Sequence, residues 1–328
     1  MHQTGKDLQT DMENNQKKNA SAAGNKRTAR KSASRLVDKK NEKRVWQPRS
    51  DSRFDLKKEK TTAVRDAVES APKNDSENGI HGDYENGAVI GRNAVRELLR
   101  AERPIDKLLV QRGERNGSIV VLVSQAIERG IPVIEVEKSK LDQMAGFAPH
   151  QGVIALAAEK EYCSVEDILQ IAKERGEDPL IVICDGITDP YNLGAIIRCA
   201  ECCGAHGLII PKRRAVGLTP LVTKASAGAV EHLAIAKVAN IAATVEQLKK
   251  IGVWTYAAEA GGESVYKTDL SGPCAIVLGS EGDGVSQIVQ KTCDAIVSIP
   301  MYGRVNSFNV STAAAILLAE AARRHHAE

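Results

Sequence analysis

Three short segments of the chain carry small polar side chains, glycines and single charges at spacings that suit ligand binding and catalysis. The first contains Asn192, Gly194 and Arg198, the second contains Gly279, Glu281 and Gly284, and the third runs from 299 to 311. Each segment follows an apolar stretch of the kind that forms a buried strand. Because ligands in α/β proteins bind just beyond the strand ends, we expect all three segments to contribute to a site.

The third segment is the most informative of the three. Small polar residues or glycine occupy five of the nine positions from 303 to 311, namely Gly303, Asn306, Ser307, Asn309 and Ser311. Asn and Ser are preferred helix N-caps, which accounts for one of these positions but not for five. An apolar strand precedes the loop and a helix with apolar spacing begins at Val310. The loop therefore predicts ligand contacts as well as a helix cap.

The glycines of the second segment allow the backbone to wrap closely round a ligand. Their spacing is G-x-x-G-x-G, which differs from the dinucleotide fingerprint G-x-G-x-x-G and lacks the Lys-Ser/Thr of a P-loop. A simple turn would also explain them. Glu281 lies among the glycines and favours a site over a turn, because a carboxylate held there needs a partner.

In the first segment, Asn192 can cap the helix that follows, and Gly194 allows another part of the backbone to approach closely. Arg198 lies six residues after Asn192, inside the first helical turns. Taken alone, Arg198 indicates a surface ion pair with Glu201 at the (i, i+3) spacing.

The pattern of apolar and polar residues divides the chain into three parts and a linker. Residues 1–84 are poor in large apolar residues and predict a disordered basic extension. Residues 85–160 alternate between strand and helix patterns and predict a small α/β domain. A connecting helix is expected over 159–176, and residues 161–178 are assigned to the linker between the domains. Residues 179–328 predict a largely parallel sheet covered on both faces.

The individual elements follow from the same patterns. In the small domain we expect strands at 107–110, 131–136 and 152–157, and helices from about 95 and over 119–129. In the larger domain we expect strands at 180–185, 208–210, 232–238, 253–257, 275–278 and 295–299. The helices there are expected from 193, near 221, over 244–250 and 285–291, and from 310.

Composition indicates a reduced, cytoplasmic protein. No apolar run approaches the roughly 18–20 residues that a membrane helix needs, and the first residues lack the apolar core of a secretory signal. The seven cysteines show no disulfide-scaffold pattern. Three of them share one helical face, at 199, 202 and 203, and their apolar neighbours favour packing over metal binding.

The net charge of +3 conceals an asymmetry between the two ends of the chain. Residues 1–84 contain 19 Lys/Arg and 13 Asp/Glu, whereas residues 85–328 contain 26 Lys/Arg and 29 Asp/Glu. Residues 21–60 are the basic part of the extension, with 14 positive and 5 negative side chains. Such a segment suits a polyanion such as RNA or DNA, and a solvated extension that only aids solubility explains it equally well.

Taken together and in this order, the three segments resemble the motifs of the SpoU/TrmH family of RNA ribose 2′-O-methyltransferases. The first matches the family's Asn-x-Gly-x-x-x-Arg and the second its Gly-x-Glu-x-x-Gly. The third matches Ile-Pro-Met…Ser-Leu-Asn-Val-Ser, with Phe308 where the family usually has Leu. The stretch Lys-Ala-Ser-Ala-Gly-Ala at 224–229 also resembles the family's segment between its first two motifs.

The small domain is similar to the family as well. Gly-Arg-Asn-Ala-Val at 91–95 and His-Gln-Gly at 150–152 resemble the start and end of its RNA-binding domain, which is similar to ribosomal protein L30e. The resemblance covers about residues 86–325 and is greatest to the bacterial 23S rRNA guanosine-2′-O-methyltransferases.

This resemblance implies a SPOUT-type trefoil-knotted parallel-sheet domain preceded by the small L30e-like α/β domain and the disordered basic tail. It also implies S-adenosylmethionine (AdoMet) as cofactor, 23S rRNA as substrate, no membrane partner, and a homodimer whose subunits both contribute to the site. The backbone at Gly279, Ile299 and Phe308 is implied to hold the cofactor. The residues implied to contact RNA are Arg92, Asn93, His150 and Gln151.

The resemblance also implies roles in the reaction. Arg198 is placed at the ribose 2′-hydroxyl, and Asn192, Glu281, Ser307 and Asn309 would position Arg198 and the ribose. In the family this arginine is proposed as the base, although a guanidinium has a pKa above about 12. We expect Arg198 to hold an RNA phosphate and to aim the hydroxyl, whether or not it takes the proton.

Other functions fit the sequence less well. A tRNA 2′-O-methyltransferase is an alternative, but the L30e-like domain favours rRNA, and an rRNA-methylating resistance enzyme would have a similar layout. A non-enzymatic RNA-binding ribosome-assembly factor is disfavoured because the motif residues are intact. A Rossmann dehydrogenase is disfavoured because its fingerprint is missing.

Overall fold

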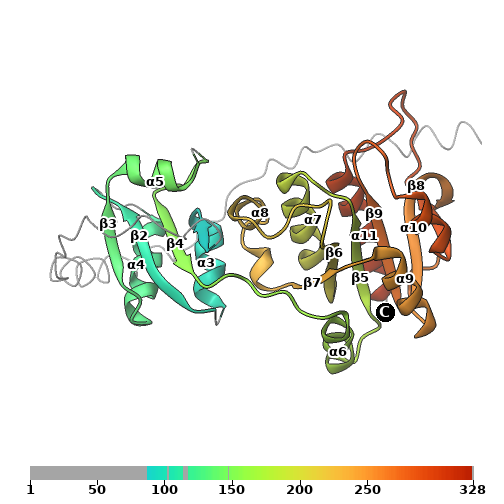
Figure 1. Ribbon diagram of the computed structural model, residues 1–328, viewed down its shortest axis with the longest axis horizontal. Helices are drawn as coiled ribbons and strands as arrows, with labels where there is room; N and C mark the ends of the chain where they lie inside the picture. Colours follow the sequence, from blue (N-terminus) through green and yellow to red (C-terminus); the bar gives the residue numbers. More distant parts are fainter. Residues whose placement is uncertain (1–86, 102, 114–116, 147, 327–328) are drawn as a thin grey trace, which may run out of the picture. The chain divides into compact units, whose positions relative to one another are not determined.

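The computed structural model describes residues 87–326, apart from residues 102, 114–116 and 147. The extension expected at 1–84 lies outside the described residues. The described part of the chain forms two separate sheets, each with helices packed against it (Figure 1). No described helix is long and apolar enough to cross a membrane.

The first sheet has four strands in the order β1-β4-β2-β3. Its elements are β1 (Ala88–Ile90), α3 (Arg92–Arg100), β2 (Ile105–Gln111), α4 (Ser118–Glu128), β3 (Val133–Val136), α5 (Lys138–Met144) and β4 (Val153–Ala157). Strand β4 pairs antiparallel with β1 and β2, whereas β2 and β3 are parallel.

Both faces of this sheet are covered, because successive side chains of a strand point to opposite faces. In β2, Leu108 packs in a buried cluster with residues of α3 and α4, such as Leu98 and Leu122. Leu109 packs in a different cluster with Leu141 of α5. The expected small α/β domain is therefore present.

Two elements of this domain differ from expectation. Helix α5 was not expected, because its sequence Lys-Ser-Lys-Leu-Asp-Gln-Met has a single buried residue, Leu141, and so shows no apolar stripe. Strand β1 has only three residues, all buried, and lies where the sequence indicated only a lead into the first helix. Short elements of this kind leave too few periods for a pattern to detect.

The second sheet has six strands in the order β10-β8-β9-β5-β6-β7, and every pair is parallel. The strands are β5 (Leu180–Asp185), β6 (Gly207–Pro211), β7 (Ala234–Val238), β8 (Trp254–Ser264), β9 (Cys274–Gly279) and β10 (Ala295–Ser298). The helices are α6 (Val165–Arg175), α7 (Pro190–Cys202), α8 (Pro220–Ala225), the 3-10 helix η2 (Ala229–Glu231), α9 (Ile241–Lys250), α10 (Gln287–Thr292) and α11 (Val310–His325).

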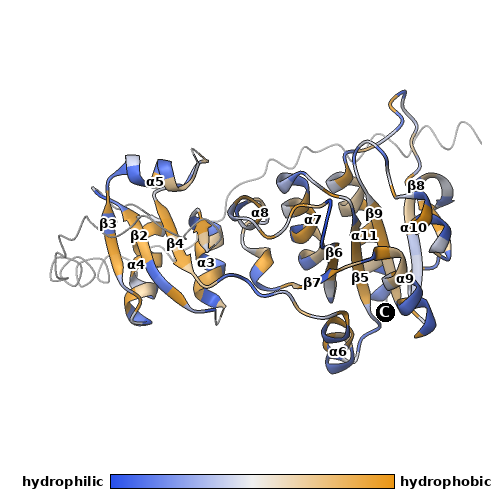
Figure 2. Ribbon diagram, viewed as in Figure 1, coloured by the Kyte–Doolittle hydropathy of each residue, from blue (hydrophilic) through white to orange (hydrophobic). Residues whose placement is uncertain are grey.

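Helices cover both faces of this sheet, as the continuous apolar strands predict. In β5, Val182 packs in one buried cluster with residues of α7 and α11, and Ile183 packs in another with residues of α9 and α10. Figure 2 shows β5 and β9 coloured as hydrophobic along most of their length. The apolar positions predicted for the last helix are all buried, namely Val310, Ala314, Leu317, Leu318 and Ala321.

Five described helices of this domain, α6, α7, α8, α9 and α11, begin at side chains that cap their first turns. Asp189 caps α7 and is followed by Pro190, and Thr219 caps α8 and is followed by Pro220. Asn309 caps α11. Proline suits the first helical position because its missing N–H has no partner there in any case. These caps set where each loop ends at the carboxyl edge of the sheet.

Most expected boundaries differ from the structure by three residues or fewer, and two differ by more. The connecting helix expected over 159–176 begins only at Val165, because Ser164 and Asp167 form a capping box there and Cys163 pairs with Ala236 of β7 in an isolated bridge. Strand β8, expected to end at residue 257, continues to Ser264 alongside β10 with a shift in register. The glycines in this extension hid it, since glycine is unfavourable in strands.

Candidate active site

The loops after β5, β9 and β10 bring one side chain from each predicted motif into direct contact. Asn192 Nδ2 donates a hydrogen bond to Glu281 Oε1 at 2.6 Å, and Asn309 Nδ2 donates to the same oxygen at 2.7 Å. Asn309 Nδ2 also lies 3.1 Å from Asn192 Oδ1. Residues 89 and 117 positions apart in the sequence therefore form one polar cluster.

The start of each helix fixes two of these side chains. Asn192 lies in the first turn of α7, where its backbone N–H donates to the Asp189 carboxylate at 2.9 Å, and it is buried. Asn309 caps α11, and its Oδ1 accepts hydrogen bonds from Ser311 N at 2.9 Å and from Ser311 Oγ at 2.6 Å. The oxygen of the Asn309 amide thus accepts from the first turn of α11 and its nitrogen donates to Glu281, so these hydrogen bonds fix one orientation of the amide.

A cavity of about 540 Å³ lies beside this cluster, within the usual range of small-molecule sites. The three residues predicted to hold the cofactor, Gly279, Ile299 and Phe308, all line it. Glu281, Ser307 and Asn309 line it as well. Apolar Leu278 and Leu317 contribute one part of the wall and the 279–284 backbone contributes another, which suits a ligand with an aromatic ring and polar groups such as AdoMet.

Glu259 holds the glycine-rich loop of this cavity in place and was not predicted. Its carboxylate accepts a hydrogen bond from Val285 N, at the end of the loop. Ser280 and Gly284 close the loop through two backbone hydrogen bonds, of 3.0 and 3.1 Å. Gly284 has φ +66°, and a Cβ there would lie 2.2 Å from Glu259 Oε1, so only glycine fits.

Arg198, the predicted reactive residue, is not part of this cluster. It is exposed on α7 and lines neither the 540 Å³ cavity nor the adjoining cavity described below. Its side chain forms no hydrogen bond or ion pair with the described residues, so the (i, i+3) pair with Glu201 is absent there. Six residues of helix place Arg198 on a different side of α7 from Asn192.

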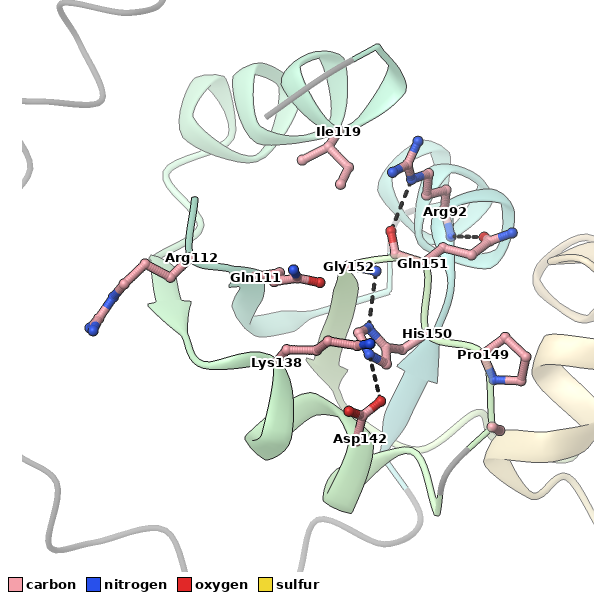
Figure 3. Close-up of a pocket in the computed structure, with 11 residues that line it drawn as sticks. Arg92, Gln111, Arg112, Ile119, Lys138, Asp142, Pro149, His150, Gln151 and Gly152 are labelled. Carbon is pink, nitrogen blue, oxygen red and sulfur yellow. Dashed lines mark hydrogen bonds and ion pairs between the residues drawn. The ribbon is translucent and has the colours of Figure 1, made fainter. Parts of the chain in front are cut away.

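The small domain contains a separate cavity of about 430 Å³ with a basic and amide-rich lining (Figure 3). Arg92 and Gln151, both predicted to contact RNA, line it and are bound to each other. Arg92 N donates to Gln151 Oε1 and Arg92 Nε donates to Gln151 O, both at 2.9 Å. Gln111 and Lys138 also line the cavity and were not predicted.

Of the two other residues predicted to contact RNA, His150 lines the same cavity and Asn93 does not. His150 is 5% exposed, its Nε2 lies 3.0 Å from Asp142 Oδ1, and its Nδ1 accepts from Gly152 N at 3.0 Å. Both ring nitrogens therefore have hydrogen-bond partners, and the donor from Gly152 to Nδ1 assigns the proton to Nε2. His150 thus stabilises the turn at 150–152 (Figure 3). Asn93 is exposed next to the cavity but does not line it.

The turn that carries Gln151 has an unusual backbone. Gln151 has φ +55°, in the left-handed region that residues other than glycine rarely adopt. Gly152 follows with φ +80°, and a Cβ there would lie 3.1 Å from Ile119 Cδ1. Such strain persists only where the surroundings enforce it, and it is concentrated at functional sites. Here the hydrogen bonds of Arg92 and His150 hold the turn.

Two family models match the chain, one over each domain. The SpoU rRNA Methylase family model matches residues 179–319, which contain the Asn192–Glu281–Asn309 cluster and the larger cavity beside it. The model for RNA 2′-O ribose methyltransferase substrate binding matches residues 88–163, which contain the basic cavity of the small domain.

Individual relatives match along almost their whole length. Bacillus subtilis YacO, named provisionally as a TrmH family tRNA/rRNA methyltransferase, is 42% identical over 239 residues, which are 73% of this chain and 96% of YacO. A Staphylococcus aureus (strain MSSA476) protein of the same description is 44% identical over 245 residues, covering 74% and 98%.

Solved structures of similar proteins contain AdoMet. The SpoU methyltransferase AviRb from Streptomyces viridochromogenes, in complex with AdoMet, has a TM-score of 0.59 and 27% identity, covering 72% of this chain and 89% of its own. The AdoMet-bound rRNA methyltransferase from Sinorhizobium meliloti has a TM-score of 0.60 and 26% identity, covering 74% and 88%.

Proposed function

Because this chain belongs to the SpoU/TrmH family of AdoMet-dependent RNA methyltransferases, we propose that it methylates the ribose 2′-hydroxyl of one guanosine in 23S rRNA. The contact between Asn192, Glu281 and Asn309 carries this proposal. It joins the three motifs at the wall of the cavity where the cofactor residues lie.

The cavity beside the cluster is assigned to AdoMet, which when bound supplies a methyl group made electrophilic by the sulfonium. Gly279, Ile299 and Phe308 line the cavity and hold the cofactor mainly through backbone groups. Glu259 acts indirectly by keeping the 280–284 loop in the conformation that shapes this wall. Orientation is the main task left to the protein in such a reaction.

In the transfer, the 2′-hydroxyl would receive the methyl group that bound AdoMet supplies, with the electron pair of the broken carbon–sulfur bond left on the sulfur. The hydroxyl proton would leave to a nearby basic group or water. Glu281 uses Oε1 to accept from both amides, whereas Oε2 forms no hydrogen bond within the described residues. Oε2 is therefore available to the ribose or to a guanidinium.

We propose that this guanidinium is Arg198 of the partner subunit in a homodimer. Arg198 of the same chain lies outside the cavities, and the loop at 301–309 is exposed along its whole length, including Tyr302 at 97% and Val305 at 74%. A second copy of the chain would cover these apolar side chains and complete the site. The arginine would hold an RNA phosphate and aim the hydroxyl.

A mixed-dimer experiment tests this arrangement. Arg198→Ala and Glu281→Ala each inactivate a homodimer, with losses of about 10²-fold or more. In a heterodimer of the two variants, a shared site restores one complete pair, Glu281 of one subunit with Arg198 of the other. About half the wild-type activity is expected. A heterodimer as inactive as its parents would show that the arginine acts within its own chain or not at all.

The remaining features of the fold are proposed on the same resemblance. We assign residues 85–160 to an L30e-like RNA-binding domain, 161–178 to a linker and 179–328 to a trefoil-knotted domain, in a protein that acts in the cytoplasm. Asn309 bonds Asn192 and Glu281 although β10 is an edge strand, which supports a chain that crosses back to the middle of the sheet.

The choice of 23S rRNA over tRNA rests on the basic cavity of the small domain, where Arg92, Lys138 and two glutamines meet. Glutamine amides suit base edges and the cations suit phosphates. Ribose-methylation mapping of 23S rRNA and tRNA, from cells with and without the gene, tests the choice. Loss of one 23S rRNA guanosine methylation is expected, and a loss confined to tRNA would assign the alternative substrate.

A further inference from the structure

A second cavity, of about 790 Å³, adjoins the catalytic cluster at the carboxyl edge of the large sheet. The loop at 280–284 and Val310 line both this cavity and the cofactor cavity. Asn192 lines the second cavity and not the cofactor cavity. The two spaces therefore share one thin wall, and that wall carries Glu281.

Two arginines that line this second cavity belong to none of the family motifs identified in the sequence. Arg213 and Arg214 lie in the loop after β6 and are exposed. Neither guanidinium forms a hydrogen bond or ion pair with any residue that the structure describes, although four carboxylates line the same cavity. Arg214 also has φ +60°, a left-handed conformation that a non-glycine residue adopts only where surrounding contacts enforce it.

Most of the carboxylates in this cavity are already bound to neutral donors. Asp185 accepts from Ser286 N at 2.9 Å, Asp189 accepts from Asn192 N at 2.9 Å, and Glu281 accepts from two amides. Asp283 is the fourth and is exposed in the loop. Unpaired guanidinium groups and hydrogen-bonded carboxylates thus line the same cavity, and of the carboxylates Glu281 and Asp283 also line the cofactor cavity.

We propose that this second cavity holds the acceptor nucleotide, and that Arg213 and Arg214 bind the RNA phosphates on either side of the ribose to be methylated. Phosphates are repelled by the carboxylates and so take the arginine side, as arginine is the residue best suited to phosphate. The ribose hydroxyl and base N–H groups then face the acceptors at the shared wall. A 2′-hydroxyl at that wall lies next to the cofactor cavity. This assignment of the acceptor nucleotide rests on the proposed methyl transfer.

The experiment compares the full-length protein with an Arg213→Gln/Arg214→Asn variant. Asn is chosen at 214 because it tolerates the left-handed backbone. Arg175→Gln is the matched control, since Arg175 is exposed on α6, away from both cavities. Total rRNA from cells lacking the gene serves as the RNA probe, and binding is measured over a range of salt concentrations. AdoMet affinity and thermal stability are measured on the same samples.

Loss of two phosphate contacts should reduce the slope of log affinity against log salt by about 1.4 for single-stranded RNA. The KM for RNA should rise at least about tenfold, the scale of lost charged hydrogen bonds, while AdoMet affinity stays as in the control. Arg213→Lys/Arg214→Lys should recover most of the slope, because lysine still neutralises phosphate.

Two results would overturn the proposal: a salt slope equal to that of the Arg175→Gln control, or a failure of the lysine variant to recover the slope. The second would mean that the arginines only shape their loop. These binding measurements do not depend on turnover. If wild-type protein transfers no methyl group to rRNA yet the double variant loses salt slope, the proposed reaction fails while the phosphate contact stands.

Discussion

Replacing Gly279 by alanine should close the cofactor cavity from its backbone side. A Cβ at Gly279 would lie 1.9 Å from the carbonyl carbon of Gly284 and 2.1 Å from Val285 N. Ordinary contact begins at 3.4 Å, so the facing backbone must retreat by about 1.5 Å, the difference between 3.4 and 1.9 Å. That backbone belongs to the loop that Glu259 anchors, and it has no flexible side chain to give way.

The magnitude follows from this displacement. A misplacement of about 1 Å at a site costs about 10²-fold, so the Kd for AdoMet should rise by about 10²-fold, equivalent to about 2.7 kcal/mol. Overpacking of this kind should also lower the free energy of unfolding by about 1–3 kcal/mol. Isothermal titration calorimetry with AdoMet and urea unfolding measure the two effects separately.

Gly282→Ala is the matched control. It changes the same loop, but a Cβ at Gly282 would meet no atom within 4 Å and no positive φ constrains the residue. Its AdoMet affinity should stay within about threefold of wild type, because a surface substitution is usually worth less than about 0.5 kcal/mol. If Gly279→Ala binds AdoMet as tightly as Gly282→Ala does, the loop is not the wall of the cofactor site.

Three further predictions concern the cluster, a buried ion pair and pH. Asn309→Ala should lower the free energy of unfolding by about 1 kcal/mol through loss of the α11 cap, and should also reduce methyl transfer. Asn309→Asp should keep the cap and still lose activity, because it places a second carboxylate beside Glu281. Differential scanning calorimetry measures the stability of each variant, and a tritiated-methyl assay measures its activity. Arg103 Nη2 lies 3.1 Å from the almost fully buried Glu231 carboxylate, so Arg103→Met should lower the free energy of unfolding by about 3 kcal/mol. Arg103→Met/Glu231→Leu should recover most of that loss in urea titrations. Equal stability of the two variants would refute this prediction. Burial lowers the pKa of His206 although its hydrogen bond to Glu177 opposes the shift. The unfolded chain then binds the proton more readily, so the free energy of unfolding should fall as pH drops through about 6.5, and His206→Gln should flatten that dependence between pH 7.5 and 5.5.

The sequence predicted the residues of the Asn192–Glu281–Asn309 cluster better than their surroundings. Asn192 and Glu281 follow β5 and β9, whose apolar runs are long and uninterrupted, so their position at one edge could be inferred from the strand pattern. Asn309 follows the short strand β10, and its place in the cluster was indicated by the third motif. Glu259 was not predicted, because the glycines in the second half of β8 lower the strand propensity of that part of the sequence. The apolar pattern ended the strand at residue 257, two residues before Glu259, whereas β8 continues to Ser264.

Side-chain environment was the harder part to predict. The predicted contact of His150 with RNA stays a prediction, but its hydrogen bond to Asp142 could not be predicted, because Asp142 lies on α5, a helix without an apolar stripe. The exposed position of Arg198, away from the cavity, depends on the helical rotation that follows Asn192. Motif spacing identifies which residues belong together in a family, and it does not tell which chain supplies each of them.

The bond from Asn309 to Asn192 has a consequence for how the protein matures. The two residues are 117 positions apart, and Asn309 precedes only the last helix. A nascent chain therefore emerges from the ribosome with the first motif exposed long before the third exists. Contacts of such sequence separation form late and slowly. AdoMet, by binding only the completed cavity, would favour the final docking step through mass action.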